Sequence, residues 1–179
     1  MRELKIVFTK SKKKIALFSR LLRWWTRKPY SHVAREVIRQ DWGAGYYQAS
    51  EGHVNYEHES VFHKKHEIVK SYTLMVDDHY EMSVRKACWE DCGKDYGVWQ
   101  NVGIFLVDIG LLRDTPWKDG RNCSELIYLK VFHDLLPLNY NPDTIKPHHL
   151  EDIILEYFVE RDGKWYLATE LPLDSGSET

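Results

Sequence analysis

The chain has 179 residues, of which 43% are hydrophobic and 29% charged, and this balance suits one packed domain and excludes a globally disordered chain. No apolar run approaches the ~20 residues of a membrane-spanning helix, and the charged start of the chain does not resemble a secretory signal. Three cysteines are too few for a disulfide framework and favour a reducing compartment. We therefore expect a cytoplasmic protein, or one that a phage particle or another delivery system carries.

Charge is distributed unevenly along the chain. The formal net charge is −2, yet the first 35 residues hold eleven Lys or Arg against a single Glu. A basic segment on an acidic body either meets an anionic partner, such as phosphate groups or lipid headgroups, or pairs with the body itself. Both explanations stay open at this point.

The first part of the chain predicts strands around one helix. Residues 4–9 alternate apolar and polar side chains, as a half-buried strand does. Residues 12–28 carry apolar side chains at helical period, and Pro29 ends this helix. The elements expected next are a strand at residues 31–38, a turn at Gly43 and Gly45, an extended segment at residues 46–49, a turn at residues 51–52 and a short strand around Val54.

The helix expected at residues 12–28 has two faces. Its apolar face consists of Ile15, Phe18, Leu21, Leu22 and Trp25. Its basic face consists of Lys13, Arg20, Arg23 and Arg27. Packing of the apolar face against a sheet is the simpler explanation, and it leaves the basic face open to an anionic membrane surface, a nucleic acid or an anionic substrate.

The rest of the chain predicts further helices and a C-terminal hairpin. The expected elements are a strand at residues 68–76, helices at 80–92, 122–136 and 147–155, and strands at 157–161 and 164–168 around the turn signal Asp162-Gly163. Residues 96–112 are apolar and interrupted by glycine, and the sequence does not separate helix from irregular structure there. We expect one α+β domain at residues 1–169 and a flexible tail at 170–179.

Cys123 is the strongest candidate for a nucleophile. It stands in the first turn of a predicted helix, where the helix N-terminus favours an anion and lowers the pKa of a thiol. A thiolate needs a proton partner, and His32 begins a predicted core strand that can hold one. Gln48, on the next extended segment, is placed to orient the imidazole, with Glu51 as the substitute. Taken singly, a buried cysteine or a strand histidine is more often structural.

Five short motifs occur in a characteristic order. They are residues 29–34 (PYSHVA, after a helix ending RWWT), 46–54 (YYQASEGHV), 94–97 (KDYG), 122–126 (NCSEL) and 143–150 (DTIKPHHL). Together they resemble the circularly permuted papain-like (NlpC-type) cysteine amidase and peptidase family, in which the histidine precedes the cysteine. The resemblance covers roughly residues 3–156.

The resemblance implies a fold and an activity. The fold is α+β, with an antiparallel sheet packed against helices and the nucleophile at a helix N-terminus. Cys123 matches the nucleophile and His32 the general base and acid, while Gln48 stands where the family commonly has glutamate, so we expect Gln48→Glu to keep or raise activity. Tyr96 matches a tyrosine that assists at the oxyanion.

The activity implied is that of a thiol protease or amidase, a hydrolase with a catalytic triad that needs no cofactor. It cleaves an amide bond, for example in a peptidoglycan-type peptide, through a thioacyl intermediate. Two alternatives remain: a lipid-directed thiol acyltransferase or esterase of the same fold, and a non-catalytic module that binds membrane or nucleic acid through the basic helix.

A metal site is the remaining alternative. Cys88 and Cys92 lie four residues apart on one helix face and could supply two zinc ligands. No second pair follows at a standard spacing, and the adjacent His148 and His149 point in different directions, so we favour packing for both cysteines and expect no metal. The remaining histidines of the central stretch are expected to be solvated; they are His53, His58, His63 and His66.

Overall fold

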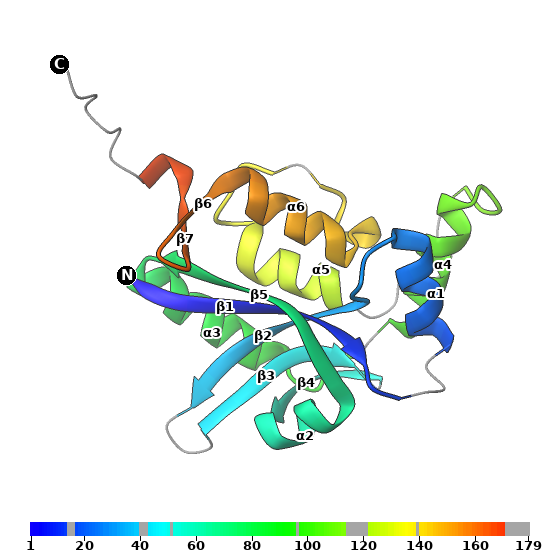
Figure 1. The fold of residues 1–179 in the computed structure, drawn as a ribbon, viewed down its shortest axis with the longest axis horizontal. Coiled ribbons are helices and arrows are strands. Elements are labelled where there is room, and N and C mark those ends of the chain that lie inside the picture. Colours follow the sequence, from blue (N-terminus) through cyan, green and yellow to red (C-terminus); the bar gives the residue numbers. More distant parts are fainter. Residues whose placement is uncertain are drawn as a thin grey trace.

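The computed structural model describes residues 1–13, 17–39, 43–50, 52–95, 97–113, 122–138 and 140–170. These residues form an α+β fold with one seven-stranded sheet, whose strands lie in the order β4-β3-β2-β1-β5-β7-β6 (Figure 1). The strands are β1 (Arg2–Ser11), β2 (His32–Arg39), β3 (Gly43–Ser50), β4 (His53–His58), β5 (His66–Val76), β6 (Phe158–Arg161) and β7 (Lys164–Leu167).

The sheet is mixed, so the expectation of a wholly antiparallel sheet is wrong at one pair of strands. β5 and β7 run parallel, with Leu74 opposite Trp165 and Met75 opposite Tyr166. Parallel pairing requires a long crossover connection, and the helices between β5 and β7 provide it. The hairpin of β6 and β7 turns at Asp162 and Gly163, which both have positive φ, as the sequence predicts.

Six α-helices accompany the sheet among the described residues. They are α1 (Leu17–Thr26), α2 (Glu59–Lys65), α3 (Asp78–Asp91), α4 (Val98–Asp108), α5 (Cys123–Ile127) and α6 (Pro147–Tyr157). The helix predicted at residues 12–28 is therefore confirmed over residues 17–26, while Lys12 and Lys13 precede it and Arg27 follows it. The helix predicted at 122–136 is divided, because a π-helical turn (Tyr128–Phe132) follows α5. No helix in the described ranges has the length and hydropathy needed to cross a membrane.

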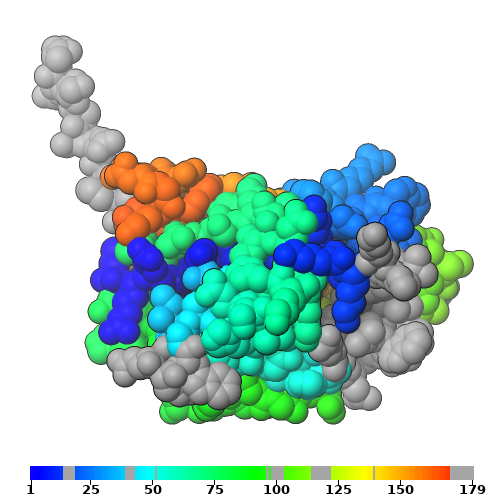
Figure 2. Space-filling model, turned by 60° about the horizontal axis from the view of Figure 1, so that its bottom comes forward, coloured from blue at the N-terminus to red at the C-terminus, as the bar shows by residue number. Residues whose placement is uncertain are grey.

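The two faces of the sheet carry cores of different size. Leu4, Ile6 and Phe8 of β1 join the large core with α5 and α6, whereas Val7 points the other way into a small cluster that Phe62 of α2 closes. This alternation is the one predicted for residues 4–9. α2 covers the small-core face of the sheet, where it contacts β3, β4 and β5, at the front of Figure 2.

Gly45 was expected in a turn but lies within β3, where it pairs with Val37 of β2. A Cβ atom on Gly45 would come within 2.4 Å of the Tyr56 side chain. Only glycine therefore lets the Tyr56 ring lie across this strand. Gly43, the first residue of β3, has a φ of +73° and is the position that needs glycine for its backbone.

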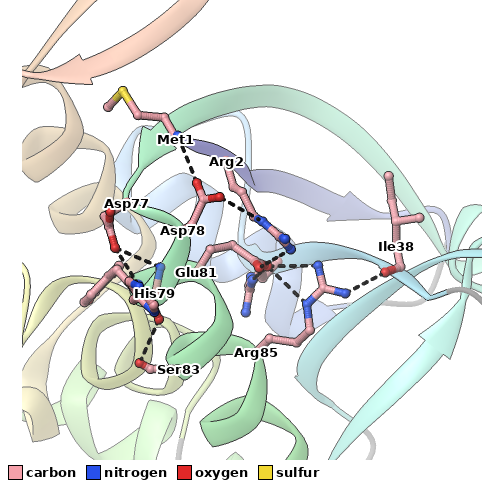
Figure 3. Close-up of polar contacts among 11 residues, drawn as sticks. Met1, Arg2, Ile38, Asp77, Asp78, His79, Glu81, Ser83 and Arg85 are labelled. Atoms are coloured by element: carbon pink, nitrogen blue, oxygen red, sulfur yellow. Dashed lines mark hydrogen bonds and ion pairs between the residues drawn. The ribbon is translucent and has the colours of Figure 1, made fainter.

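A network of charges holds α3 against the first two strands. The Met1 amine lies 2.9 Å from the Asp78 carboxylate, and the buried Glu81 accepts hydrogen bonds from Arg85 at 3.0 Å and from Arg35 at 2.7 Å (Figure 3). Arg35 is 1% exposed, and a guanidinium is tolerated in a core only when a carboxylate accompanies it. The ion pair with Glu81 thus accounts for the burial of Arg35, a charged residue in a strand that the sequence predicts to lie in the core.

Candidate active site

Cys123 is the first residue of α5, as the sequence predicts, and a capping box fixes this turn. The Asn122 side-chain oxygen accepts the N–H groups of Ser124 and Glu125, each at 2.9 Å. The Glu125 carboxylate accepts the N–H of Asn122 in return. Cys123 is 4% exposed, so it lies at a capped and nearly buried helix start.

His32 is the first residue of β2 and hydrogen-bonds the side chain predicted to orient it. Its Nε2 lies 2.8 Å from Oε1 of Gln48, which is fully buried in β3. Because an amide oxygen only accepts, Nε2 of His32 carries the proton and donates. The Nδ1 atom then remains for the hydrogen bond between His32 and Cys123. The structure thus brings Cys123, His32 and Gln48 together from three elements.

Electrostatics favour the charged forms of the thiol and the imidazole. Burial raises the pKa of Cys123, but the positive charge of His32, the hydrogen bond from it and the Val33 backbone N–H bring this pKa below its ordinary value. Burial lowers the pKa of His32, but the negative charge of Cys123 and the hydrogen bond between them raise it above its ordinary value. The two shifts together favour a thiolate beside an imidazolium.

Glu57 of β4 is a member of this arrangement that the sequence analysis missed. Its Oε2 accepts a hydrogen bond from Nε2 of Gln48 at 3.1 Å, and its Oε1 accepts one from Lys65 at 2.7 Å. Gln48 pairs with Asn55 across the β3–β4 ladder, so Glu57 is its diagonal neighbour on the same face. Glu51, the substitute orienter of the sequence analysis, lies outside the described residues.

His66 also belongs to the site, so the expectation that it is a solvated residue is wrong. Its ring stacks on His32 with centroids 5.1 Å apart and on Phe62 of α2 at 4.7 Å. Burial, followed by the charge of His32, lowers the pKa of His66 to about 3, so the ring stays neutral beside the imidazolium. His66 begins β5 opposite Ser11 of β1, a position that only the tertiary fold reveals.

Of the three other histidines between residues 53 and 66, two are exposed and one contacts a tyrosine. His53 and His58 are exposed, as the sequence predicts. His63 instead lies 3.3 Å from the hydroxyl of Tyr46, so it is not simply solvated.

Cys123 lines a cavity of about 80 Å³ between α1, α4 and α6. Its walls include Leu22 and Trp25 of α1 and Ile104 of α4. These apolar side chains face Lys146 and His148, which lie at the start of α6. A substrate group that enters the cavity therefore meets apolar walls and a polar side at the nucleophile.

The polar side of the cavity was not foreseen as part of the site. Burial lowers the pKa of His148 to about 4, so it is a neutral hydrogen-bonding group. Lys146 lies over the Trp25 ring at 4.5 Å and pairs with Asp108 of α4. Lys146 therefore ties the three helices together around the cavity. The motif at residues 143–150 was the only sequence signal for these two side chains.

Three other residues that the sequence singled out are not seen at this site, because they lie in another part of the fold or outside the described residues. Tyr96 lies outside the described residues. Cys88 belongs to α3, where it packs in the large core and burial raises its pKa, and Cys92 directly follows this helix and packs against the same core. Within the described ranges, no three His, Cys, Asp or Glu side chains are grouped so as to hold a metal.

The basic residues of the N-terminal segment do not form one continuous face. Lys13, which precedes α1, lines one surface hollow together with Arg20 and Arg23. Arg27, which follows α1 and has a φ of +53°, lines another hollow with Trp24. The expectation that all four lie on one helix face is therefore wrong for Lys13 and Arg27.

Comparison of the chain with family models, with curated proteins and with solved structures finds no match. The function has therefore to be inferred from the site. The features that bear on it are the position of Cys123 at a helix start, its contact with His32 and the cavity in front of it.

Proposed function

We propose that this chain is a cysteine hydrolase with a circularly permuted papain-like fold, which cleaves an amide bond through a thioacyl intermediate. One observation carries the proposal: the Cys123 thiol, at a helix start and lining a cavity, contacts an imidazole whose other nitrogen is held by buried Gln48. A nucleophile, a base and a group that orients the base are the minimum set for covalent acyl transfer.

The proposed reaction has two stages. The Cys123 thiolate attacks the carbonyl carbon, an S–C bond forms, and the resulting tetrahedral intermediate collapses with loss of the C–N bond while the Nδ1–H of His32 protonates the departing amine. Water then attacks the thioester, and His32 removes a proton from this water. The S–C bond breaks, the acid leaves, and the proton on His32 restores the thiolate–imidazolium pair.

The negative oxygen of the tetrahedral intermediate needs donors. The capping box occupies the N–H groups of Asn122, Ser124 and Glu125, and among the described residues it does not use the N–H of Cys123. This N–H is our candidate donor, and one such donor is worth about 3 kcal/mol in the transition state. By the family resemblance, Tyr96 is the second donor.

A lipid-directed thiol esterase or acyltransferase is the second candidate. The observation that favours it is the wall of the cavity, where Leu22, Trp25 and Ile104 suit an acyl chain better than a polar peptide. The chemistry at Cys123 is the same in both cases, because an ester and an amide differ only in the leaving group.

Acylation by an activated ester tests the shared chemistry. The chain is mixed with p-nitrophenyl acetate, nitrophenolate release is followed, and the quenched protein is analysed by mass spectrometry. We expect a burst and an acetyl group on Cys123, both lost in Cys123→Ala and kept in Cys88→Ala. Acetylation spread equally over the three cysteines would contradict the proposal. The two candidates are then separated by their substrates. Release of an amine from short peptides would favour the amide hydrolase, and release of fatty acid from lipid esters would favour the lipid-directed enzyme.

A further inference from the structure

One end of the molecule exposes apolar and basic side chains side by side. Trp24 of α1 is 75% exposed, and Ile109, just after α4, is 47% exposed. Trp24, Arg27 and Ile109 line one surface hollow. Figures 1 and 2 both show α1 (blue) beside α4 (light green) at this end, and the edge-on contact of Trp25 with Phe105 joins the two helices.

Three arginines lie near the exposed tryptophan. Helical spacing puts Arg20 in line with Trp24 and Arg23 beside it, and Arg27, which directly follows α1, lines the same hollow as Trp24. Within the described residues, no carboxylate lies at ion-pair distance from these three arginines. We call Arg20, Leu21, Arg23, Trp24, Arg27 and Ile109 the α1–α4 face.

More positive charge adjoins the α1–α4 face. Arg20 and Arg23 share a second surface hollow with Lys10, Lys12 and Lys13, and one acidic residue, Glu67, lines it as well. Lys10 is paired with this Glu67 at 2.9 Å. The positive charge of the hollow therefore exceeds its negative charge, and an anionic partner would be attracted to it.

We propose that the α1–α4 face binds the surface of a membrane that contains anionic lipids. Trp24, Leu21 and Ile109 would lie at the boundary between headgroups and acyl chains, with the arginines against the phosphates. A nucleic acid explains less of this surface. Arginine and tryptophan suit phosphates and bases, but the exposed aliphatic Leu21 and Ile109 gain nothing from a polyanion.

The same surface adjoins the cavity of Cys123. Trp25 lines both the hollow of the α1–α4 face and the cavity, and Leu22 of the same helix lines the cavity. A membrane bound at this face would therefore lie one side chain away from the cavity. Binding itself does not depend on the proposed hydrolysis, and the experiment treats the two separately.

Sedimentation with vesicles tests the proposal on the full chain. Phosphatidylcholine vesicles, with and without phosphatidylglycerol, are pelleted with the protein, and the bound fraction is measured at low and high salt. We expect binding only with phosphatidylglycerol, and weaker binding as salt rises. Arg20→Gln with Arg23→Gln should weaken it about fivefold per charge, and Trp24→Ala roughly tenfold.

Matched variants of α3 serve as controls. Trp89→Ala removes a tryptophan that is 57% exposed, and Lys86→Gln removes a cation that is 80% exposed, both away from the α1–α4 face. We expect these two variants, and Cys123→Ala, to bind as the parent does. Trp24 is too exposed for its loss to unfold the chain, and circular dichroism of each variant checks this.

Three results would overturn the proposal. The first is equal binding to vesicles with and without phosphatidylglycerol. The second is an equal loss of binding in Trp89→Ala and Trp24→Ala. The third is tight binding to a DNA duplex that Arg20→Gln weakens, without binding to vesicles. Loss of acylation in Cys123→Ala with retained vesicle binding would support membrane binding that is independent of the proposed catalysis.

Discussion

Nε2 of Gln48 lies 3.1 Å from Oε2 of Glu57, and this hydrogen bond fixes which end of the amide faces His32. A carboxylate only accepts, so the amino group of Gln48 turns to Glu57 and its oxygen turns to the imidazole at 2.8 Å. The neutral orienter thus has a negative charge directly behind it, and that charge also raises the pKa of His32. Lys65 in turn pairs with Glu57.

This relationship changes the expectation for Gln48→Glu. A glutamate at position 48 would place two carboxylates within hydrogen-bond distance and without a proton between them, which raises the pKa of one of them. We now predict that Gln48→Glu lowers the acylation rate of Cys123 about tenfold at neutral pH, with partial recovery in acid. Burst rates measured across pH check this, and an undiminished rate at neutral pH would count against the role of Glu57.

Exchange of the two residues should restore the arrangement. Glu57→Gln alone frees the amide of Gln48 to turn, and we predict about a tenfold slower acylation. In Gln48→Glu with Glu57→Gln, the carboxylate accepts from His32 and from the new amide, so the rate should recover most of the loss. Acylation rates of the four proteins form a double-mutant cycle. Additive losses in the double variant would mean that the two side chains act independently.

The reactivity of the cysteines should follow their surroundings. We predict that Cys123→Ala abolishes acylation with little change in the unfolding temperature, because the capping box of Asn122 and Glu125 stays intact. Cys88→Ala should lower stability instead, because Cys88 is 3% exposed in the large core, and should keep acylation. Cys92→Ala should change neither strongly. Thermal unfolding and burst amplitude of the three variants, measured in parallel, check this, and equal loss of activity in all three would point to a structural role.

The pH dependence of acylation follows from the paired shifts at the site. The pKa of Cys123 is lowered, so the acid limb of the rate should lie below the ~8.5 of a free thiol. The pKa of His32 is raised, so the alkaline limb should lie above its usual ~6.5. We predict a bell-shaped profile with its maximum between the two limbs. A rate that rises through the ordinary thiol range without an earlier limb would show that the ion pair does not form.

Glu151 of α6 should make stability depend on pH. Its carboxylate accepts hydrogen bonds from Lys28, Tyr30, Lys70 and Tyr72. Burial raises the pKa of Glu151, but these donors outweigh burial and lower it to about 2. Because the folded pKa is depressed, this stabilisation is fully present above about pH 4.5 and is lost as the pH falls through 2.

Replacement of the Glu151 carboxylate by a neutral amide tests how much this carboxylate stabilises the fold. We predict that Glu151→Gln lowers the free energy of unfolding by about 3 kcal/mol at neutral pH, because the buried hydroxyls of Tyr30 and Tyr72 and two partly exposed lysines lose their anion. Glu156→Gln, on the exposed side of the same helix, is the matched control and should change it little. Denaturant unfolding at neutral pH and at pH 3 checks this, and the two variants should converge in acid. Equal stabilities at neutral pH would contradict it.

The sequence predicts the parts of the site that local patterns encode. Cys123 follows a capping residue, His32 begins an alternating strand, and Gln48 lies in the next extended segment, so each could be found from its own element. Glu57 was missed because its place beside Gln48 depends on the register of β3 and β4. His66 was missed because a seven-residue helix with one buried side chain, α2, shows too little periodicity to be recognised.

The contacts between distant elements could not be predicted from the sequence either, because they depend on how the elements pack together. Lys146 and His148 reach the cavity only because α6 packs beside α1 and α4. The parallel pairing of β7 with β5 likewise has no local signature, since residues 164–167 have the same alternation in either direction. Turn signals at Asp162 and Gly163, which are local, predicted the hairpin correctly.

The central claim is that Cys123 and His32 form a thiolate–imidazolium pair, and the pH dependence of iodoacetamide labelling tests it most directly. The labelling rate of each cysteine is read by mass spectrometry in the parent chain and in His32→Ala. The pair predicts that Cys123 reacts fast well below the ~8.5 of a free thiol, faster than Cys88 or Cys92, and that it slows without His32. Labelling of Cys123 in the ordinary thiol range, unchanged in His32→Ala, would contradict the claim.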